Sequence, residues 1–130
     1  ALSAPSKPAR RPSVPLLVDL AGETLGPGDI VRLSDNYDTG PGSGPVDLMV
    51  YDPRQDDCGL GMIVASGYKS GLILHDFPLA SHSPQGGLSV DWLIANWHDW
   101  FVFTYHEDHR IPVEQTRVLR WNARTMPEEL

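Results

Sequence analysis

The chain has 130 residues, of which 41% are hydrophobic, and a formal net charge of −7, which fits one globular domain with a modest core. Its single cysteine excludes an internal disulfide framework, and no apolar run approaches the roughly 20 residues that a helix needs to span a bilayer. We therefore predict a cytoplasmic protein without a membrane segment, in which Cys58 has a structural role.

The N-terminal residues differ in composition from the rest of the chain. Residues 1–15 contain prolines at 5, 8, 12 and 15 together with small polar and basic residues, and they lack the apolar core of a secretory signal. Such a segment buries too little apolar surface to offset its conformational entropy, so we predict a disordered Pro-rich arm. We expect a single β-rich domain over residues 16–125 and a frayed tail at 126–130.

The charge is unevenly distributed. Lys7, Arg10 and Arg11 give residues 1–18 a charge of +3, whereas residues 19–130 hold the other seven basic residues and all seventeen acidic ones, a net charge of −10. A domain this acidic is not suited to nucleic acid, whose affinity for proteins comes largely from phosphate neutralisation. Two explanations of this negative charge remain open. It could serve solubility alone, or it could attract a basic protein partner over a distance.

Short strand patterns separated by turns occupy most of the chain. Residues 16–18 are expected either to pair onto a sheet edge or to dock against the domain. Gly59 and Gly61 indicate a β-bulge or a close approach of two backbones. The strands that we predict are 30–33, 46–51, 59–66 with 72–77 as its hairpin partner, 101–105 and 116–121.

One helix is predicted late in the chain, over residues 89–100. Ser89 is a suitable N-cap, and Asp91 lies in the first turn, where the helix dipole favours a carboxylate. The apolar stripe at helical spacing contains Val90, Leu93, Ile94, Trp97, Trp100 and Phe101. Trp92 points off this stripe, so it belongs either to the core or to a surface that anchors a partner.

Together these patterns predict a mainly β fold of the α+β class. Its shape is expected to be a small bent antiparallel sheet or an SH3-like partly open barrel, with one late amphipathic helix.

Two groups of residues have the chemistry of a catalytic or metal site. The sequence 106–109 places His106 and His109 around two acids, but the spacing matches no recognised metal motif. Asp47, Asp52, Asp56 and Asp57 offer paired carboxylates, but we expect these acids on turns, with no sign of a cleft. Because phosphate-binding loops and nucleophile elbows are also missing from the sequence, we predict a protein that is not an enzyme and has no metal or cofactor.

Several segments within residues 46–101 carry a resemblance to a known family. They are YDPR at 51–54, GLGMI at 59–63, SGYKSGL at 66–72, GLS at 87–89, and the helical pattern with Trp92, Leu93, Ile94, Asn96, Trp97 and Trp100. By this pattern the chain resembles small bacterial immunity proteins, the antidotes encoded beside polymorphic toxins such as those of contact-dependent and type VI delivery. The resemblance implies a cytoplasmic, non-enzymatic protein that binds one cognate toxin domain and blocks it, and it transfers no contact residues.

The residues themselves indicate where such a partner would bind. An acidic antidote would associate quickly with a basic toxin domain, so we expect contacts from the acidic and aromatic loops. The predicted contact residues are Asp35, Tyr37, Asp38, Asp56, Asp57, Glu107 and Asp108. The alternatives are an SH3-like module that recognises a protein or peptide, and a small metal-dependent enzyme centred on His106 and His109.

Overall fold

The computed structural model describes residues 14–34, 45–67, 69–101 and 111–120. In this part of the chain the strands form two antiparallel sheets, one of five strands and one of two. The larger sheet has the order β5 (Ile73–Asp76), β4 (Gly61–Val64), β3 (Val46–Tyr51), β2 (Ile30–Leu33) and β7 (Arg117–Leu119). The smaller sheet pairs β1 (Thr24–Leu25) with β6 (Leu88–Ser89).

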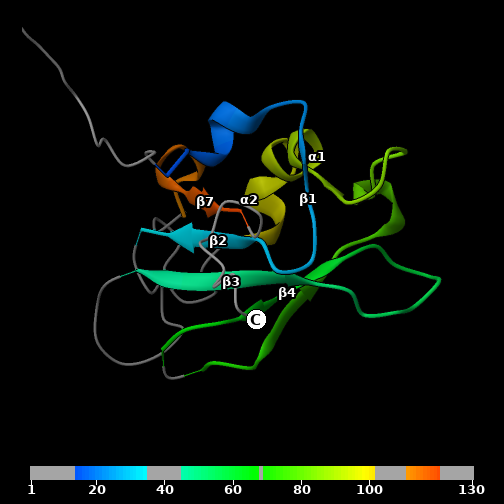
Figure 1. Cartoon of the computed structure of the whole chain (residues 1–130), viewed down its shortest axis with the longest axis horizontal. Helices are drawn as coiled ribbons and strands as arrows, with labels where there is room; N and C mark the ends of the chain where they lie inside the picture. The colour runs from blue at the N-terminus through cyan, green and yellow to red at the C-terminus, as the bar shows by residue number, and fades with distance from the viewer. Residues whose placement is uncertain (1–13, 35–44, 68, 102–110, 121–130) are drawn as a thin grey trace, which may run out of the picture.

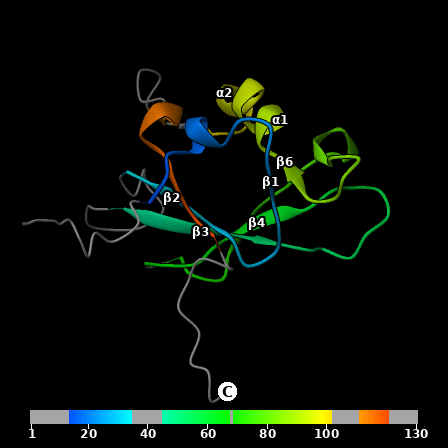
Figure 2. The ribbon, with the colours of Figure 1, turned by 45° about the horizontal axis from the view of Figure 1, so that its top comes forward.

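Short helices complete the described structure. The α-helices are α1 (Val90–Ala95) and α2 (Trp97–Trp100), and the 3₁₀ helices are η1 (Leu17–Leu20), η2 (Leu79–Ser81) and η3 (Val113–Gln115). Figures 1 and 2 show α1, α2 and η1 on one side of the larger sheet. The prediction of a mainly β fold is confirmed, and the sheet is open rather than closed into a barrel.

The alternation of side chains along β3 explains why the sheet has one buried face. Val46, Leu48 and Val50 are buried against the helical layer, whereas Asp47 and the other intervening residues lie on the opposite face, partly exposed. Successive side chains of a strand point to opposite faces, so one apolar set supplies the core. The predicted bounds of β2 and β3 are confirmed, and the hairpin of β4 with β5 is present in a shorter form.

The predicted helix begins where expected but does not continue unbroken. Ser89 caps α1, because its Oγ accepts a hydrogen bond from the Trp92 backbone N–H at 3.1 Å. At Asn96 the backbone leaves the helical region, with φ −108° and ψ 12°. The Asn96 side-chain amide also donates to the Trp92 carbonyl at 2.9 Å, which the Asn96 backbone N–H shares at 3.0 Å. The prediction of one continuous helix over 89–100 was therefore wrong, because the segment forms two helices, α1 and α2.

The core lies between the larger sheet and the helical layer. Leu93 and Trp97 are fully buried there, as expected from the apolar stripe. Trp97 stacks on Phe101, with ring centroids 4.0 Å apart, and its indole N–H donates to the Ile111 carbonyl at 2.8 Å. This bond fixes α2 to the segment that leads into η3 and β7.

The segment before η1 covers the edge of the larger sheet at β7. Leu16 forms a bridge with Arg117, Val118 donates to the Pro15 carbonyl at 3.0 Å, and Leu17 is fully buried. Residues 16–18 were expected to pair or to dock, and the segment does both. The last predicted strand is present as β7, whereas residues 102–105 of the strand predicted at 101–105 lie outside the described residues.

Candidate functional site

An acidic surface lies where β3 connects to β4 and β5 ends. Asp52, Asp56 and Asp57 are exposed on the connection that follows β3. The turn is set by Asp52, whose carboxylate accepts a hydrogen bond from the Arg54 backbone N–H at 2.8 Å, while Arg54 adopts φ 60°. The prediction of a turn that begins at Asp52 and Pro53 is thus confirmed.

Asp76 adds a fourth carboxylate from a different element. It lies at the end of β5 and accepts a hydrogen bond from the Tyr51 hydroxyl at the end of β3. We refer to Asp52, Asp56, Asp57 and Asp76 as the acidic cluster. The sequence reasoning missed Asp76, because only the pairing of β3 with β4 and of β4 with β5 brings it beside Tyr51.

The pKa values of two neighbouring groups reflect this negative surface. Partial removal from water, the hydrogen bond to Asp76 and the charge of Asp76 raise the pKa of the Tyr51 phenol to about 12. Loss of solvation raises the pKa of the Cys58 thiol, and the charges of Asp57, Asp76 and Asp52 raise it further. A thiol with a raised pKa is mainly protonated at neutral pH, which supports the prediction that Cys58 is not a nucleophile.

Gly61 explains how β3 and β5 approach one another at this surface. Gly61 lies between Tyr51 and Asp76 in the cross-strand register. A methyl group added there would lie 2.7 Å from the Tyr51 ring and 2.6 Å from the Asp76 carboxylate, and still closer to the His75 carbonyl. The absence of a side chain at Gly61 therefore allows the Tyr51 phenol to cross β4 and reach Asp76. The predicted close approach at this glycine is confirmed, and a β-bulge lies next to it between Met62 and Ile63.

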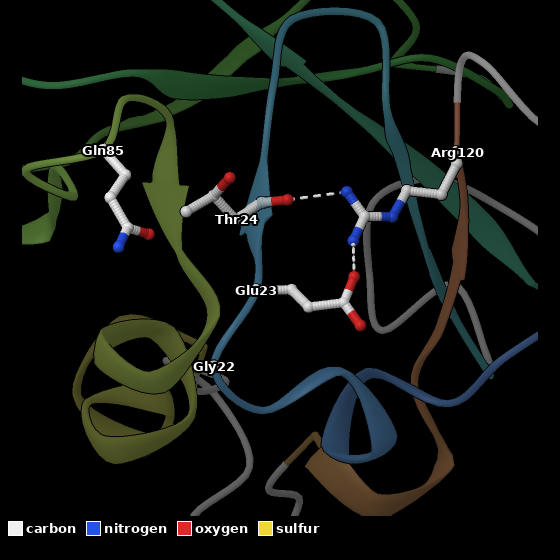
Figure 3. A pocket seen from close by; sticks show the side chains of 5 residues that line it. All are labelled: Gly22, Glu23, Thr24, Gln85 and Arg120. Atoms are coloured by element: carbon white, nitrogen blue, oxygen red, sulfur yellow. Dashed lines mark hydrogen bonds and ion pairs between the residues drawn. The ribbon is translucent and has the colours of Figure 1, made fainter.

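A polar depression lies beside β1, between it and the end of β7 (Figure 3). It has a volume of about 470 Å³ and is lined by Gly22, Glu23, Thr24, Gln85 and Arg120. Figure 3 shows Arg120 reaching from the β7 side to β1, with Gln85 on the far side of Thr24.

The guanidinium of Arg120 makes its contacts within the chain. It donates to the Thr24 carbonyl at 2.6 Å, pairs with Glu23, and lies 3.6 Å from the buried carboxylate of Asp29. Small-molecule sites are usually lined mainly by apolar and aromatic side chains. We therefore interpret this depression as a structural clamp between β1 and the end of β7.

Trp92 and His75 both pack against the core. Trp92 is half-buried, with its ring 5.8 Å from Phe77 and 6.0 Å from Trp100. His75 lies among Phe77, Trp100 and Phe101, at ring distances of 5.3–5.6 Å. Burial lowers the pKa of His75, against the opposing effects of a hydrogen bond to the Trp100 backbone and the charge of Asp76.

The structure describes only part of the predicted contact set. Asp56 and Asp57 are both exposed, as a contact residue must be. The predicted residues that lie outside the described ranges are Asp35, Tyr37, Asp38, His106, Glu107, Asp108 and His109. Within the described residues, no group of three or more His, Cys, Asp or Glu side chains is arranged to hold a metal ion.

Comparison with known protein families identifies a match. The family model described as Immunity protein 45 matches residues 17–110, a segment that begins at η1 and includes the acidic cluster. No curated protein and no solved structure matches the chain. Of the helices in the four described ranges, none has the length and apolar character needed to cross a membrane.

Proposed function

Because the chain belongs to the Immunity protein 45 family, we propose that it binds one cognate bacterial toxin domain and neutralises it by stoichiometric occlusion, without turnover. An immunity protein of this kind acts by affinity, so its working part is a surface rather than a catalytic centre. We further propose that the toxin belongs to a polymorphic toxin system and that the two proteins meet in the cytoplasm, where the free thiol of Cys58 would remain reduced.

The acidic cluster is the observation that supports this function best. Four exposed carboxylates lie on the β3–β4 connection and at the end of β5. Three of them, Asp52, Asp57 and Asp76, are close enough to the half-buried thiol of Cys58 to raise its pKa. None of the four carboxylates forms an ion pair with a lysine or arginine of the described residues. Unlike Arg32 and Asp47, which pair with each other at 2.7 Å, these carboxylates are available to an external cation.

The charge of the whole domain favours the same partner. Residues 19–130 carry a net charge of −10, so a basic domain would be attracted before contact and oriented towards the acidic surface. We therefore propose a basic toxin domain and, as its contacts, Asp35, Tyr37, Asp38, Asp56, Asp57, Glu107 and Asp108, to which we add Asp52 and Asp76.

Charge reversal tests the acidic surface. The probe is the C-terminal domain of the protein encoded immediately upstream, titrated calorimetrically with the full chain at increasing salt. We expect one-to-one binding that weakens as salt rises, and a loss of about ten-fold or more in affinity for the double variant Asp56→Lys, Asp57→Lys.

A matched control separates local contact from net charge. Asp19→Lys with Glu114→Lys changes the charge by the same amount, at two exposed acids on η1 and η3. This control should lose much less affinity than the reversal at 56 and 57. Equal losses in the two double variants would show that the toxin responds to overall charge and would refute the acidic cluster as a contact surface.

A further inference from the structure

The larger sheet has two edges, and the described residues cover only one of them. At β7, the backbone of Pro15 and Leu17 bonds to Val118 and Thr116, at 3.0 and 2.8 Å. At the other edge, β5 pairs with β4 on one side, and no strand of the described residues lies on its outer side. In an antiparallel ladder, alternate residues direct their N–H and C=O groups to either side, so the outer side of β5 carries backbone groups able to pair with another strand.

The first side chains of this edge are apolar, at positions where an edge strand often carries charge. Leu72 is 50% exposed and Ile73 is 56% exposed, next to each other at the start of β5. An exposed edge strand that must stay unpaired commonly carries charged side chains, which oppose pairing with another strand. Two adjacent apolar side chains at an unpaired edge instead favour contact with a partner.

The β-bulge places an apolar and an acidic residue of β5 on the same face. Ile63 pairs with Ile73 and Met62 pairs with His75, so Leu74 is the extra residue. Leu74 and His75 consequently pack towards the core, whereas Ile73 and Asp76 are both exposed.

Ile73 also ends an apolar row on the face of the sheet away from the helices. Residues directly opposite each other in a sheet share a face and contact one another. The row defined by the strand register consists of Leu119, Ile30, Met49, Ile63 and Ile73. A strand added beside β5 would extend this row by one apolar side chain and would pass the acidic cluster at Asp76.

We propose that β5 is the docking edge for an extended segment of the toxin, which adds a strand to the larger sheet. The segment places an apolar side chain against Ile73 and a basic side chain beside Asp76. Strand addition uses main-chain hydrogen bonds for affinity and side-chain contacts on alternate residues for specificity. This inference rests on the proposed function, and it names the part of the toxin that binds and how it binds.

The charge of the chain argues against a second copy as the occupant of this edge. Two domains with a net charge of −10 over residues 19–130 repel each other, and pairing of two β5 strands would bring two acidic clusters to one interface. A basic toxin segment has the opposite effect, because its charge compensates Asp76 and its neighbours.

Two measurements on the full chain test the proposal, with the upstream-encoded C-terminal domain as the probe. The first is hydrogen exchange of the free chain and of the complex. We expect the amides of residues 72–76 to include rapidly exchanging groups in the free chain and to gain protection in the complex, because the added strand bonds to them. Full protection of these amides in the free chain, or no gain on binding, would overturn strand addition.

The second measurement compares two variants that change the same type of side chain. Ile73→Lys and Leu79→Lys both replace a leucine-sized apolar residue that is 56% exposed, and both add one positive charge. We expect Ile73→Lys to weaken toxin binding by about ten-fold or more, and Leu79→Lys by much less. Urea unfolding confirms that both variants fold.

The outcomes separate this inference from the proposed function. Binding of the wild-type chain with equal affinities for the two variants would overturn docking at β5 and leave toxin neutralisation standing. Failure of the wild-type chain to bind at all would overturn both. Self-association of the free chain through residues 72–76, seen by sedimentation, would assign the edge to a second copy and would also refute the proposal.

Discussion

At the scale of single residues, Gly61 controls the contact between Tyr51 and Asp76. Its missing side chain leaves room for the Tyr51 ring and for the hydrogen bond between Tyr51 and Asp76. That bond connects β3 to β5 across β4, on the face of the sheet away from the core. The contact between Tyr51 and Asp76 therefore requires the missing side chain at Gly61.

We expect Gly61→Ala to destabilise the chain by about 1–3 kcal/mol, because the added methyl group overlaps the Tyr51 ring and the β5 backbone. The free energy of unfolding in urea measures this loss. Gly26→Ala is the matched control, because a methyl group at Gly26 meets no atom within 4 Å. A variant at Gly61 as stable as the one at Gly26 would show that β3 and β5 do not approach as closely as described.

At the scale of elements, His75 is the contact between β5 and α2. Its ring lies 5.3 Å from Trp100 and from Phe101, and its pKa is lowered by burial. At a pH near 6.5, the ordinary pKa of histidine, His75 therefore binds fewer protons in the folded chain than in the unfolded chain. The neutral form of the His75 imidazole therefore favours the contact of β5 with the helical layer, and protonation opposes it.

The sign of this shift gives a pH dependence. The free energy of unfolding should be highest above pH 6.5 and should fall as the pH decreases towards the lowered pKa of the folded state. In His75→Phe, which keeps an aromatic ring and removes the proton site, this decrease should be smaller. Urea unfolding between about pH 5 and 8 measures it.

His82→Phe is the control, because His82 is exposed in the folded chain. It should keep the pH dependence of the wild-type chain. If His75→Phe kept it as well, burial of the imidazole would not be its cause.

The elements that the sequence predicted well are those whose apolar pattern has a clear period. β3 alternates buried and partly exposed residues over its whole length, and Ser89 caps α1 as its position before the apolar stripe indicated. The break at Asn96 was missed because no proline or glycine marks it. The pairing of β1 with β6 was missed because two residues are too few to show any period.

The site was harder to predict than the fold. The sequence predicted that Asp56 and Asp57 lie together at the surface, because they are adjacent in the chain and follow a turn. Asp76 joins them only through the register of two strand pairs, and that register contains a β-bulge. The exposed edge at Ile73 had no sequence signal, because an apolar residue in a strand is expected to be buried until the order of the strands is known.

At the scale of the whole molecule, the core and the proposed binding surface occupy different parts of the described structure. The helical layer and the buried face of the larger sheet contain Trp97, Phe77 and the other core residues. The acidic cluster adjoins the apolar edge at β5, because Asp76 belongs to both the cluster and β5. For the proposed occlusion of a toxin, charge favours fast association and apolar contact favours slow dissociation.

The most direct test of stoichiometric neutralisation is the residual toxicity of the upstream-encoded C-terminal domain after incubation with increasing amounts of the full chain. We predict that toxicity decreases linearly with the molar ratio, reaches zero at one equivalent, and returns when the unmodified toxin is separated from the chain. Two results would contradict the proposed function. Toxicity that persists at excess chain would exclude neutralisation, and toxicity abolished over time by a small fraction of an equivalent would indicate catalytic turnover.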